Sequence, residues 1–181
     1  MQNQLVISAI GSDRPGIVNQ LSQLIVHNKG NIDDSRMTVL GGEFAIILLI
    51  SAQADELEAI EQLLQEHAEQ LELRIISKTT RYSSANTQTL NNKKRPYVVE
   101  VLAMDNPGIV YQLTNFFSDR EINIQSLETD RYPAPHTGTA MFAIEMVIAI
   151  PSTIIINELR DDFLDLCDDM NLDASIEASR F

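Results

Sequence analysis

The sequence predicts an α+β protein built from two copies of one βαββαβ module. Two observations support this prediction. Residues 13–32 recur 92 positions later, and nine of the twenty residues are identical. The repeat includes the motif Asp-x-Pro-Gly-Ile-Val, which occupies residues 13–18 in the first copy and 105–110 in the second. In both copies, apolar residues alternate in short runs or recur at helical spacing, in the same order along the chain.

The first copy begins with a β-rich run that Gly11 and Ser12 end. Pro15 suits the first turn of a helix, and Gly30 suits its C-terminal end. Gly41-Gly42 is typical of a hairpin turn between two apolar runs. The expected elements are strand 5–10, a helix from 15 to about 29, strands 32–40 and 44–52, a helix with an apolar stripe over 57–71, and strand 73–76.

The second copy gives the same order with a hairpin loop longer by six residues, which contains Pro133-Ala-Pro-His-Thr-Gly138. Its expected elements are strand 97–103, helix 107–119, strands 122–131 and 140–150, helix 152–170 and strand 172–178. The βαββαβ order favours a four-stranded antiparallel sheet with two helices on one face, the ferredoxin-like arrangement. Open sheet edges favour side-by-side pairing of modules, within one chain or across a homodimer.

Charge divides the chain into two acidic modules and a basic linker. Residues 1–80 carry a net charge of -6, residues 97–181 carry -11, and the polar stretch 81–96 carries +4, which together give -13. Such acidity repels a phosphate backbone, so we expect no direct nucleic-acid binding. Lys93-Lys94-Arg95 is too small a basic cluster to reverse this, and we interpret 81–96 as a solubilising linker.

The residues that often carry catalysis or bind metals are few and scattered. Cys167 is the only cysteine, which excludes an intrachain disulfide, and its spacing predicts a buried, inert thiol. The three histidines lack metal-ligand spacing, and no nucleophile elbow or phosphate-binding glycine loop occurs. We therefore expect no enzyme, no metal and no cofactor.

The N-terminus lacks the features of a signal peptide and residues 44–50 are too few to span a bilayer, so we expect a cytoplasmic protein without membrane contact.

The repeated turn between the first strand and first helix has two interpretations. The free N–H groups at a helix N-terminus can hold a carboxylate, and Asp13 or Asp105 can accept hydrogen bonds from an ammonium group, which together suit a small amino acid. Alternatively, the aspartate is an ordinary helix cap, the proline occupies the first helical position, and the glycine serves close packing. The residues alone leave both interpretations open.

The Asp-x-Pro-Gly-Ile-Val turn, followed by an amphipathic helix and then Asn-Ile at the start of a strand, resembles the ACT domain, a regulatory module that binds small metabolites. The resemblance covers both copies. It implies a ligand at an interface between two modules, in contact with the turn and with the start of the second strand. The implied ligand-binding residues are Asp13, Arg14, Pro15, Gly16, Ile17, Val18, Asn31 and Ile32, and Asp105, Asn106, Pro107, Gly108, Ile109, Val110, Asn123 and Ile124.

Two ACT modules with no further domain resemble the family of glycine cleavage repressors, which act through a partner transcription factor. The resemblance implies a non-catalytic transcriptional regulator with glycine as its effector. The alternative is an ACT-type subunit that binds and tunes an enzyme of amino-acid metabolism, and a third is a direct DNA-binding repressor. The change from Arg14 to Asn106 and the longer second hairpin predict that the two turns are not equivalent.

The last expected helix is strongly acidic. Asp161, Asp162, Asp165, Asp168, Asp169 and Asp173 are expected on its polar side, where like charges repel. A solvated face that keeps the protein soluble is one interpretation. The other is a docking surface for a basic partner protein that includes Asp161, Asp165 and Asp168.

Overall fold

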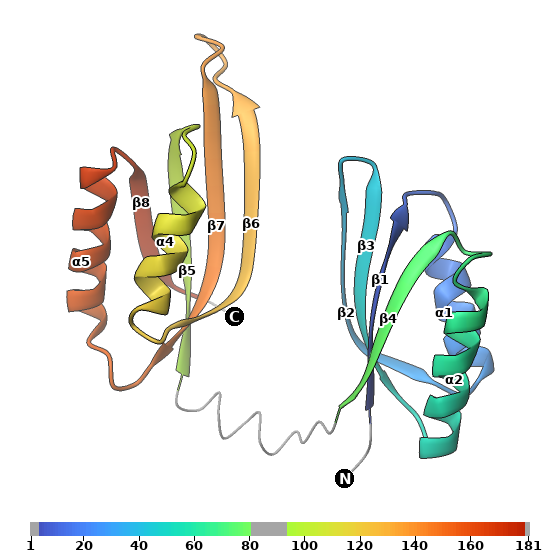
Figure 1. Cartoon of the computed structure of the whole chain (residues 1–181). Coiled ribbons are helices and arrows are strands. Elements are labelled where there is room, and N and C mark those ends of the chain that lie inside the picture. Colours follow the sequence, from blue (N-terminus) through green and yellow to red (C-terminus); the bar gives the residue numbers. More distant parts are fainter. Residues whose placement is uncertain (1–3, 81–93, 180–181) are drawn as a thin grey trace. The chain divides into compact units, whose positions relative to one another are not determined.

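The chain forms two compact units, residues 1–86 and 87–181. The structure is a computed structural model that describes residues 4–80 and 94–179. Each unit holds one four-stranded antiparallel sheet covered on one face by two helices (Figure 1). This confirms the predicted tandem ferredoxin-like fold. The expected basic linker lies largely outside the described residues.

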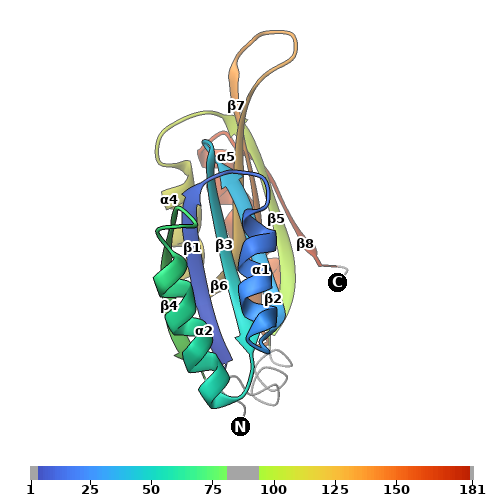
Figure 2. The same ribbon diagram turned by 90° about the vertical axis from the view of Figure 1, so that its right-hand side faces the viewer.

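The first unit contains strands β1 (Gln4–Ser12), β2 (Asn31–Leu40), β3 (Glu43–Ser51) and β4 (Leu73–Thr80), in the sheet order β2-β3-β1-β4. Helices α1 (Ile17–His27) and α2 (Ala54–His67) cover one face, as Figure 2 shows. Alternate residues of β1 and β3 point toward the helices, because side chains of a strand alternate between its faces. Leu5, Ile7, Phe44 and Ile50 are buried there, with Leu21 and Ile25 of α1.

The second unit repeats this order with β5 (Lys94–Met104), β6 (Asn123–Pro133), β7 (Ala140–Pro151) and β8 (Asp173–Ala178), arranged β6-β7-β5-β8. Helices α4 (Ile109–Ser118) and α5 (Ile156–Asp169) cover its sheet. Three aromatic rings form the centre of this core, since Phe117 stacks on Phe163 with ring centroids 5.2 Å apart and Phe116 meets both edge-on. The longer hairpin extends β6 and β7 beyond the rest of the sheet (Figure 1).

Several predicted boundaries are wrong for identifiable reasons. Strand β5 begins at Lys94, where Lys94 and Arg95 pair with Pro151 and Ile150, so residues 94–96 are strand and not linker. Pro15 and Pro107 precede the helices, because a glycine in the left-handed conformation separates each proline from the first helical residue. Helix α5 begins at Ile156 rather than near 152.

Gly30 has a different role from the one predicted. The left-handed residue that ends α1 is Lys29, with φ of 61°. Gly30 instead allows close packing, because a Cβ atom there would lie 2.7 Å from Cδ1 of Ile60 and 2.8 Å from Cγ2 of Ile25. It therefore lets α1, α2 and the start of β2 approach closely.

Candidate functional site

The two repeated turns share one backbone geometry. Gly16 and Gly108 are the N-cap residues of α1 and α4, with φ of 88° and 94°. A left-handed conformation costs other residues about 1–2 kcal/mol, which explains the glycine in both copies. A Cβ atom at either position would have nothing within 4 Å. Close packing therefore does not explain these glycines, and the space beside each turn is open.

Neither aspartate acts as a helix cap. No side chain caps α1 or α4, so the interpretation of Asp13 and Asp105 as caps is wrong. Their backbone N–H groups instead donate to Gly42 O at 3.0 Å and Ala140 O at 2.9 Å, which ties each turn to the neighbouring hairpin.

The first N–H groups of α4 are unused within the described part of the chain. The first bond within α4 joins Gln112 N to Gly108 O at 3.0 Å. The N–H groups of Ile109, Val110 and Tyr111 make no hydrogen bond with another described residue. Because these groups carry the positive end of the helix dipole, they favour a carboxylate or another anion.

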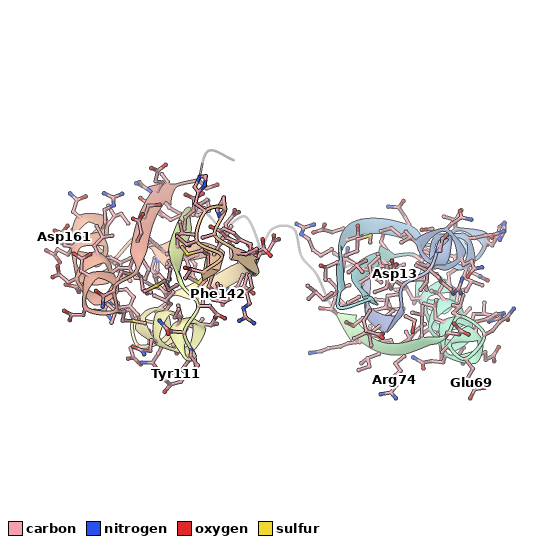
Figure 3. All side chains as sticks on the ribbon, turned by 90° about the horizontal axis from the view of Figure 1, so that it is seen from above. Asp13, Glu69, Arg74, Tyr111, Phe142 and Asp161 are labelled. Carbon is pink, nitrogen blue, oxygen red and sulfur yellow. The ribbon has the colours of Figure 1, made fainter. Side chains whose placement is uncertain are left out.

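A depression of about 450 Å³ lies beside the second turn. It is lined by Asp105, Asn106, Gly108, Ile109, Val110, Tyr111 and Phe142. Five of these seven residues belong to the predicted ligand-binding set. Tyr111 on α4 is 72% exposed, and Phe142 on β7 is partly buried (Figure 3). The depression thus combines an apolar lining with a helix N-terminus and a carboxylate.

The residue after each aspartate distinguishes the two turns. Arg14 extends from the first turn toward α1 and the loop after α2, where its Nη2 donates to Gln20 Oε1 at 2.8 Å and to Leu71 O at 3.2 Å. Asn106 takes its place in the second copy and has a much shorter side chain. The guanidinium of Arg14 therefore connects its turn to the loop after α2, and the second turn lacks this connection.

The two aspartates also differ in their partners. Asp105 Oδ2 lies 2.8 Å from Nε of Arg131 on β6, in an ion pair whose Arg131 side chain is 68% exposed. Asp13 makes no ion pair with another described residue. Exposed ion pairs contribute only about 0–1 kcal/mol. The ion pair between Asp105 and Arg131 can therefore be broken at small cost.

The predicted residues at the start of the second strand lie elsewhere. Asn31 is opposite Ser51, which pairs with Gln4, so it stands at the end of the sheet away from Asp13. Asn123 likewise stands opposite Ala149, at the end of β7 away from Asp105. One module therefore does not bring its turn and its Asn-Ile pair (Asn31-Ile32 or Asn123-Ile124) together.

Asn31 belongs to a polar cluster that sequence inspection missed. The Asp33 carboxylate accepts hydrogen bonds from Asn31 Nδ2 at 2.8 Å, Ser51 Oγ at 2.8 Å and Gln4 Nε2 at 2.7 Å. Desolvation alone would raise the pKa of Asp33, but the bonds from Ser51, Asn31 and Gln4 together outweigh it and lower the pKa below its ordinary value. The second copy has Pro96, Gln125 and Ala149 at the positions corresponding to Gln4, Asp33 and Ser51.

We predict that Asp33 stabilises the first unit only while it is ionised. Because its folded-state pKa is depressed, this stability is present above the unfolded pKa of about 3.9 and is lost as the pH falls through the folded value. The unfolding free energy of wild type should exceed that of Asp33→Asn at pH 7, and the difference should shrink toward pH 3. Urea unfolding followed by circular dichroism measures it, and a difference independent of pH would contradict the prediction.

The acidic residues of the last helix are exposed. Asp161, Asp165 and Asp168 lie on the solvent side of α5 and make no ion pair with another described residue (Figure 3 labels Asp161). Asp162 Oδ2 lies 3.1 Å from Nη2 of Arg120. Asp173 is not part of this helix, because α5 ends at Asp169 and Asp173 is the first residue of β8.

Cys167 is buried, at 1% exposure, against Phe163 and its neighbours in the core. Burial, and secondarily the Asp168 carboxylate, raise the pKa of its thiol to about 11.

Among residues 4–80 and 94–179, no group of three or more histidine, cysteine, aspartate or glutamate side chains is placed to hold a metal ion. The same residues contain no helix long and apolar enough to cross a membrane.

We predict slow modification of Cys167 by a thiol reagent in the folded protein. Only the thiolate reacts, and it is both scarce at pH 7 and shielded from solvent. Reaction with 5,5′-dithiobis(2-nitrobenzoate) should be at least about a hundredfold faster in guanidinium chloride, because the unfolded thiol is exposed and has an ordinary pKa. Equal rates in both states would contradict the buried position.

Phe142, Tyr111 and Arg131 are the site residues that sequence inspection missed. Phe142 and Arg131 come from strands that only tertiary structure brings to the turn. Tyr111 stands at the position of Asn19 in the repeat, and this difference inside an otherwise matching segment was a usable signal.

Comparison with known proteins extends the resemblance over the whole chain. The model of the ACT domain family matches residues 3–78. The glycine cleavage system transcriptional repressor of Escherichia coli is 30% identical over 185 residues, which covers 99% of this chain and 92% of the relative.

Two solved structures share the architecture of both units. An unknown protein from Galdieria sulphuraria is 28% identical with a TM-score of 0.84 and covers 99% of each chain. A second structure, described as a candidate glycine cleavage system transcriptional repressor, is 27% identical with a TM-score of 0.74 and covers 100% of this chain and 99% of the other. The chain therefore belongs to the ACT-domain family that includes the glycine cleavage system transcriptional repressor.

Proposed function

We propose that this protein is a non-catalytic transcriptional regulator that binds a small amino acid, glycine in the first place, and acts through a partner transcription factor in the cytoplasm to repress glycine cleavage genes. The observation that carries the proposal is the second turn, where unused helix N–H groups, the Asp105 carboxylate and an open depression lie together. The name of the E. coli relative supports glycine as the effector.

The second turn suits a zwitterion for electrostatic reasons. The N–H groups at the start of α4 donate hydrogen bonds to the ligand carboxylate, and Asp105 accepts hydrogen bonds from the ligand ammonium in place of Arg131. Val110, Tyr111 and Phe142 supply the apolar lining. The first turn differs in carrying Arg14, whose guanidinium is held by Gln20 and Leu71. The second turn is therefore our primary site, and the first turn is secondary.

Regulation follows if the partner and glycine prefer different states of the protein. Glycine can shift the balance only by the difference between its affinities for the two states. If the partner prefers the glycine-free state, glycine lowers the affinity for the partner by some factor. The partner then lowers the affinity for glycine by the same factor.

A reporter gene behind a glycine cleavage promoter tests this function in host cells that lack the gene for this protein. We expect low expression when wild type is supplied without glycine, and higher expression when glycine is added. The variant Gly108→Val should repress in both conditions, because it keeps the fold but not the proposed site. Equal reporter expression in cells with and without the wild-type protein would contradict the proposal.

The alternative is a regulatory subunit of an enzyme of amino-acid metabolism, as the ACT family match also allows. Affinity purification from the same cells separates the two functions. Under the alternative, the protein retained with this chain would be an enzyme, and its activity would change when the two are mixed. Under our proposal, the retained protein would be a transcription factor. A gel shift with promoter DNA and purified protein should show no complex without the partner, since the net charge of -13 repels DNA.

A further inference from the structure

Each sheet leaves one face open, because both helices of a unit lie on the other face (Figure 1). In the first unit, we define the open face as the three cross-strand rows that pass through Val6, Ser8 and Ile10 of β1. In the second unit, the open face is the three equivalent rows through Val98, Glu100 and Leu102 of β5. Directly opposite residues share a face, so each set forms one surface.

The open face of the first unit is apolar at its centre and basic at its edges. Ile10, Ile47 and Ile76 are 50%, 47% and 74% exposed. Arg74 and Lys78 stand in these rows on β4, and Arg36 stands in them on β2 (Figure 3 labels Arg74). The single acidic residue in the rows is Asp34, whose Oδ1 lies 2.6 Å from Nη1 of Arg36. The three rows therefore carry a net charge of +2 in a unit that is acidic overall.

The equivalent rows of the second unit are entirely acidic in their charged residues. Glu128, Glu145 and Glu100 stand directly opposite one another on three adjacent strands. The neighbouring rows add the carboxylates of Asp130, Asp173 and Glu177. No basic residue occurs in these rows, which gives a net charge of -6.

The acidic rows are also the more hollowed surface. A depression of about 530 Å³ lies over them, lined by residues that include Glu100, Glu128, Glu145, Asp130 and Asp173. None of these five carboxylates makes an ion pair with another described residue. Like charges directly opposite one another destabilise a sheet, so cations brought to this surface would relieve the repulsion.

We propose that the open face of the first unit binds the open face of the second unit in another copy of this chain, so that two copies form a closed homodimer. Charge complementarity supports this occupant, since the same positions carry +2 on one face and -6 on the other. The basic side chains of Arg74 and Lys78 have long apolar stems, so they can cross an apolar contact and still reach carboxylates. Stacked sheets typically lie about 10 Å apart, within the reach of such side chains.

The size of the faces favours two contacts rather than one. Three rows across four strands cover about 400 Å², so one contact between two faces buries about 800 Å² in total. That area is below the range of stable protein interfaces, whereas the two contacts of a closed dimer bury about 1,600 Å², which is a standard interface. Each copy carries both complementary faces, so a two-fold dimer buries all four open faces of the two copies in two contacts.

Charge reversal on each face separately tests the proposal. One variant carries Arg74→Glu and Lys78→Glu, which changes the first face from +2 to -2. The other carries Glu100→Lys, Glu128→Lys, Asp130→Lys and Asp173→Lys, which changes the second face from -6 to +2. Sedimentation velocity should show wild type as a dimer at micromolar concentration. Each variant alone should be monomeric, with a dissociation constant raised by about a hundredfold or more, because its two faces then have the same sign.

Mixing the two variants gives the decisive result. The acidic first face of one variant meets the basic second face of the other, and the remaining two faces keep their native charges, so a heterodimer should form. Asp161→Lys with Asp165→Lys is the control for charge change away from the faces and should leave the dimer intact. Circular dichroism checks that every variant is folded. A monomeric wild type, or variants that remain dimers alone, would overturn the proposal.

Discussion

Replacement of Gly108 by valine is expected to abolish glycine binding by this protein, or to weaken it by at least about tenfold. The substitution adds a branched side chain in the open space beside the turn, where nothing lies within 4 Å, and it disfavours the φ of 94° that aims the helix N–H groups. Isothermal titration calorimetry with glycine measures the loss.

Gly16→Val is the matched control for this prediction. Gly16 has the same conformation, with φ of 88° and an equally open Cβ position, so the backbone strain of about 1–2 kcal/mol is common to both variants. We expect Gly16→Val to retain most of the glycine binding, because the depression is beside the second turn. Equal losses in both variants would assign binding to both turns and contradict the primacy of the second.

Asn106→Arg distinguishes the effect of the backbone conformation on glycine binding from the effect of filling the depression beside the turn. The substitution copies Arg14 into the second turn without changing the glycine conformation. If the guanidinium closes the depression as we expect, glycine affinity falls while the unfolding temperature stays close to that of wild type.

Replacement of Phe163 by alanine is expected to have the largest effect on stability, about 3–5 kcal/mol. Phe163 is completely buried, and its ring contacts those of Phe116 and Phe117. The two units have separate cores, so the loss should be concentrated in the second unit. A loss of this size lowers the unfolding temperature of a unit of this length by roughly 12 °C or more.

Hydrogen exchange followed by mass spectrometry locates the effect of Phe163→Ala. Protection should fall strongly in β5, β7, α4 and α5, and much less in β1, β3, α1 and α2. Phe163→Leu keeps most of the buried volume and serves as the conservative control. An equal loss of protection in both units would show that the cores are energetically coupled, contrary to our expectation.

The fold was predictable from the sequence because its signals are local and occur twice. The 92-residue repeat gives the modular organisation, and the Gly41-Gly42 turn between two apolar runs gives the first hairpin. The start of β5 was not predictable in the same way. Lys94 and Arg95 are charged residues typical of a linker, and only their pairing with β7 makes them strand.

The candidate site was predictable only where it depends on sequence-local geometry. The left-handed glycine turn follows from the repeated motif, whereas Phe142 joins it only through the pairing of β5 with β7. The opposite charges of the open faces also required the cross-strand register. In the sequence, Glu100, Glu128 and Glu145 are far apart, and nothing local places them in one row.

Calorimetric titration of the wild-type protein with glycine tests the central claim most directly. Our account predicts saturable heat at one primary site per chain, with weaker or no binding of larger amino acids and loss of the heat in Gly108→Val. Absence of binding heat with glycine, confirmed by an unchanged unfolding temperature at saturating glycine, would contradict the claim that the second turn senses a small amino acid.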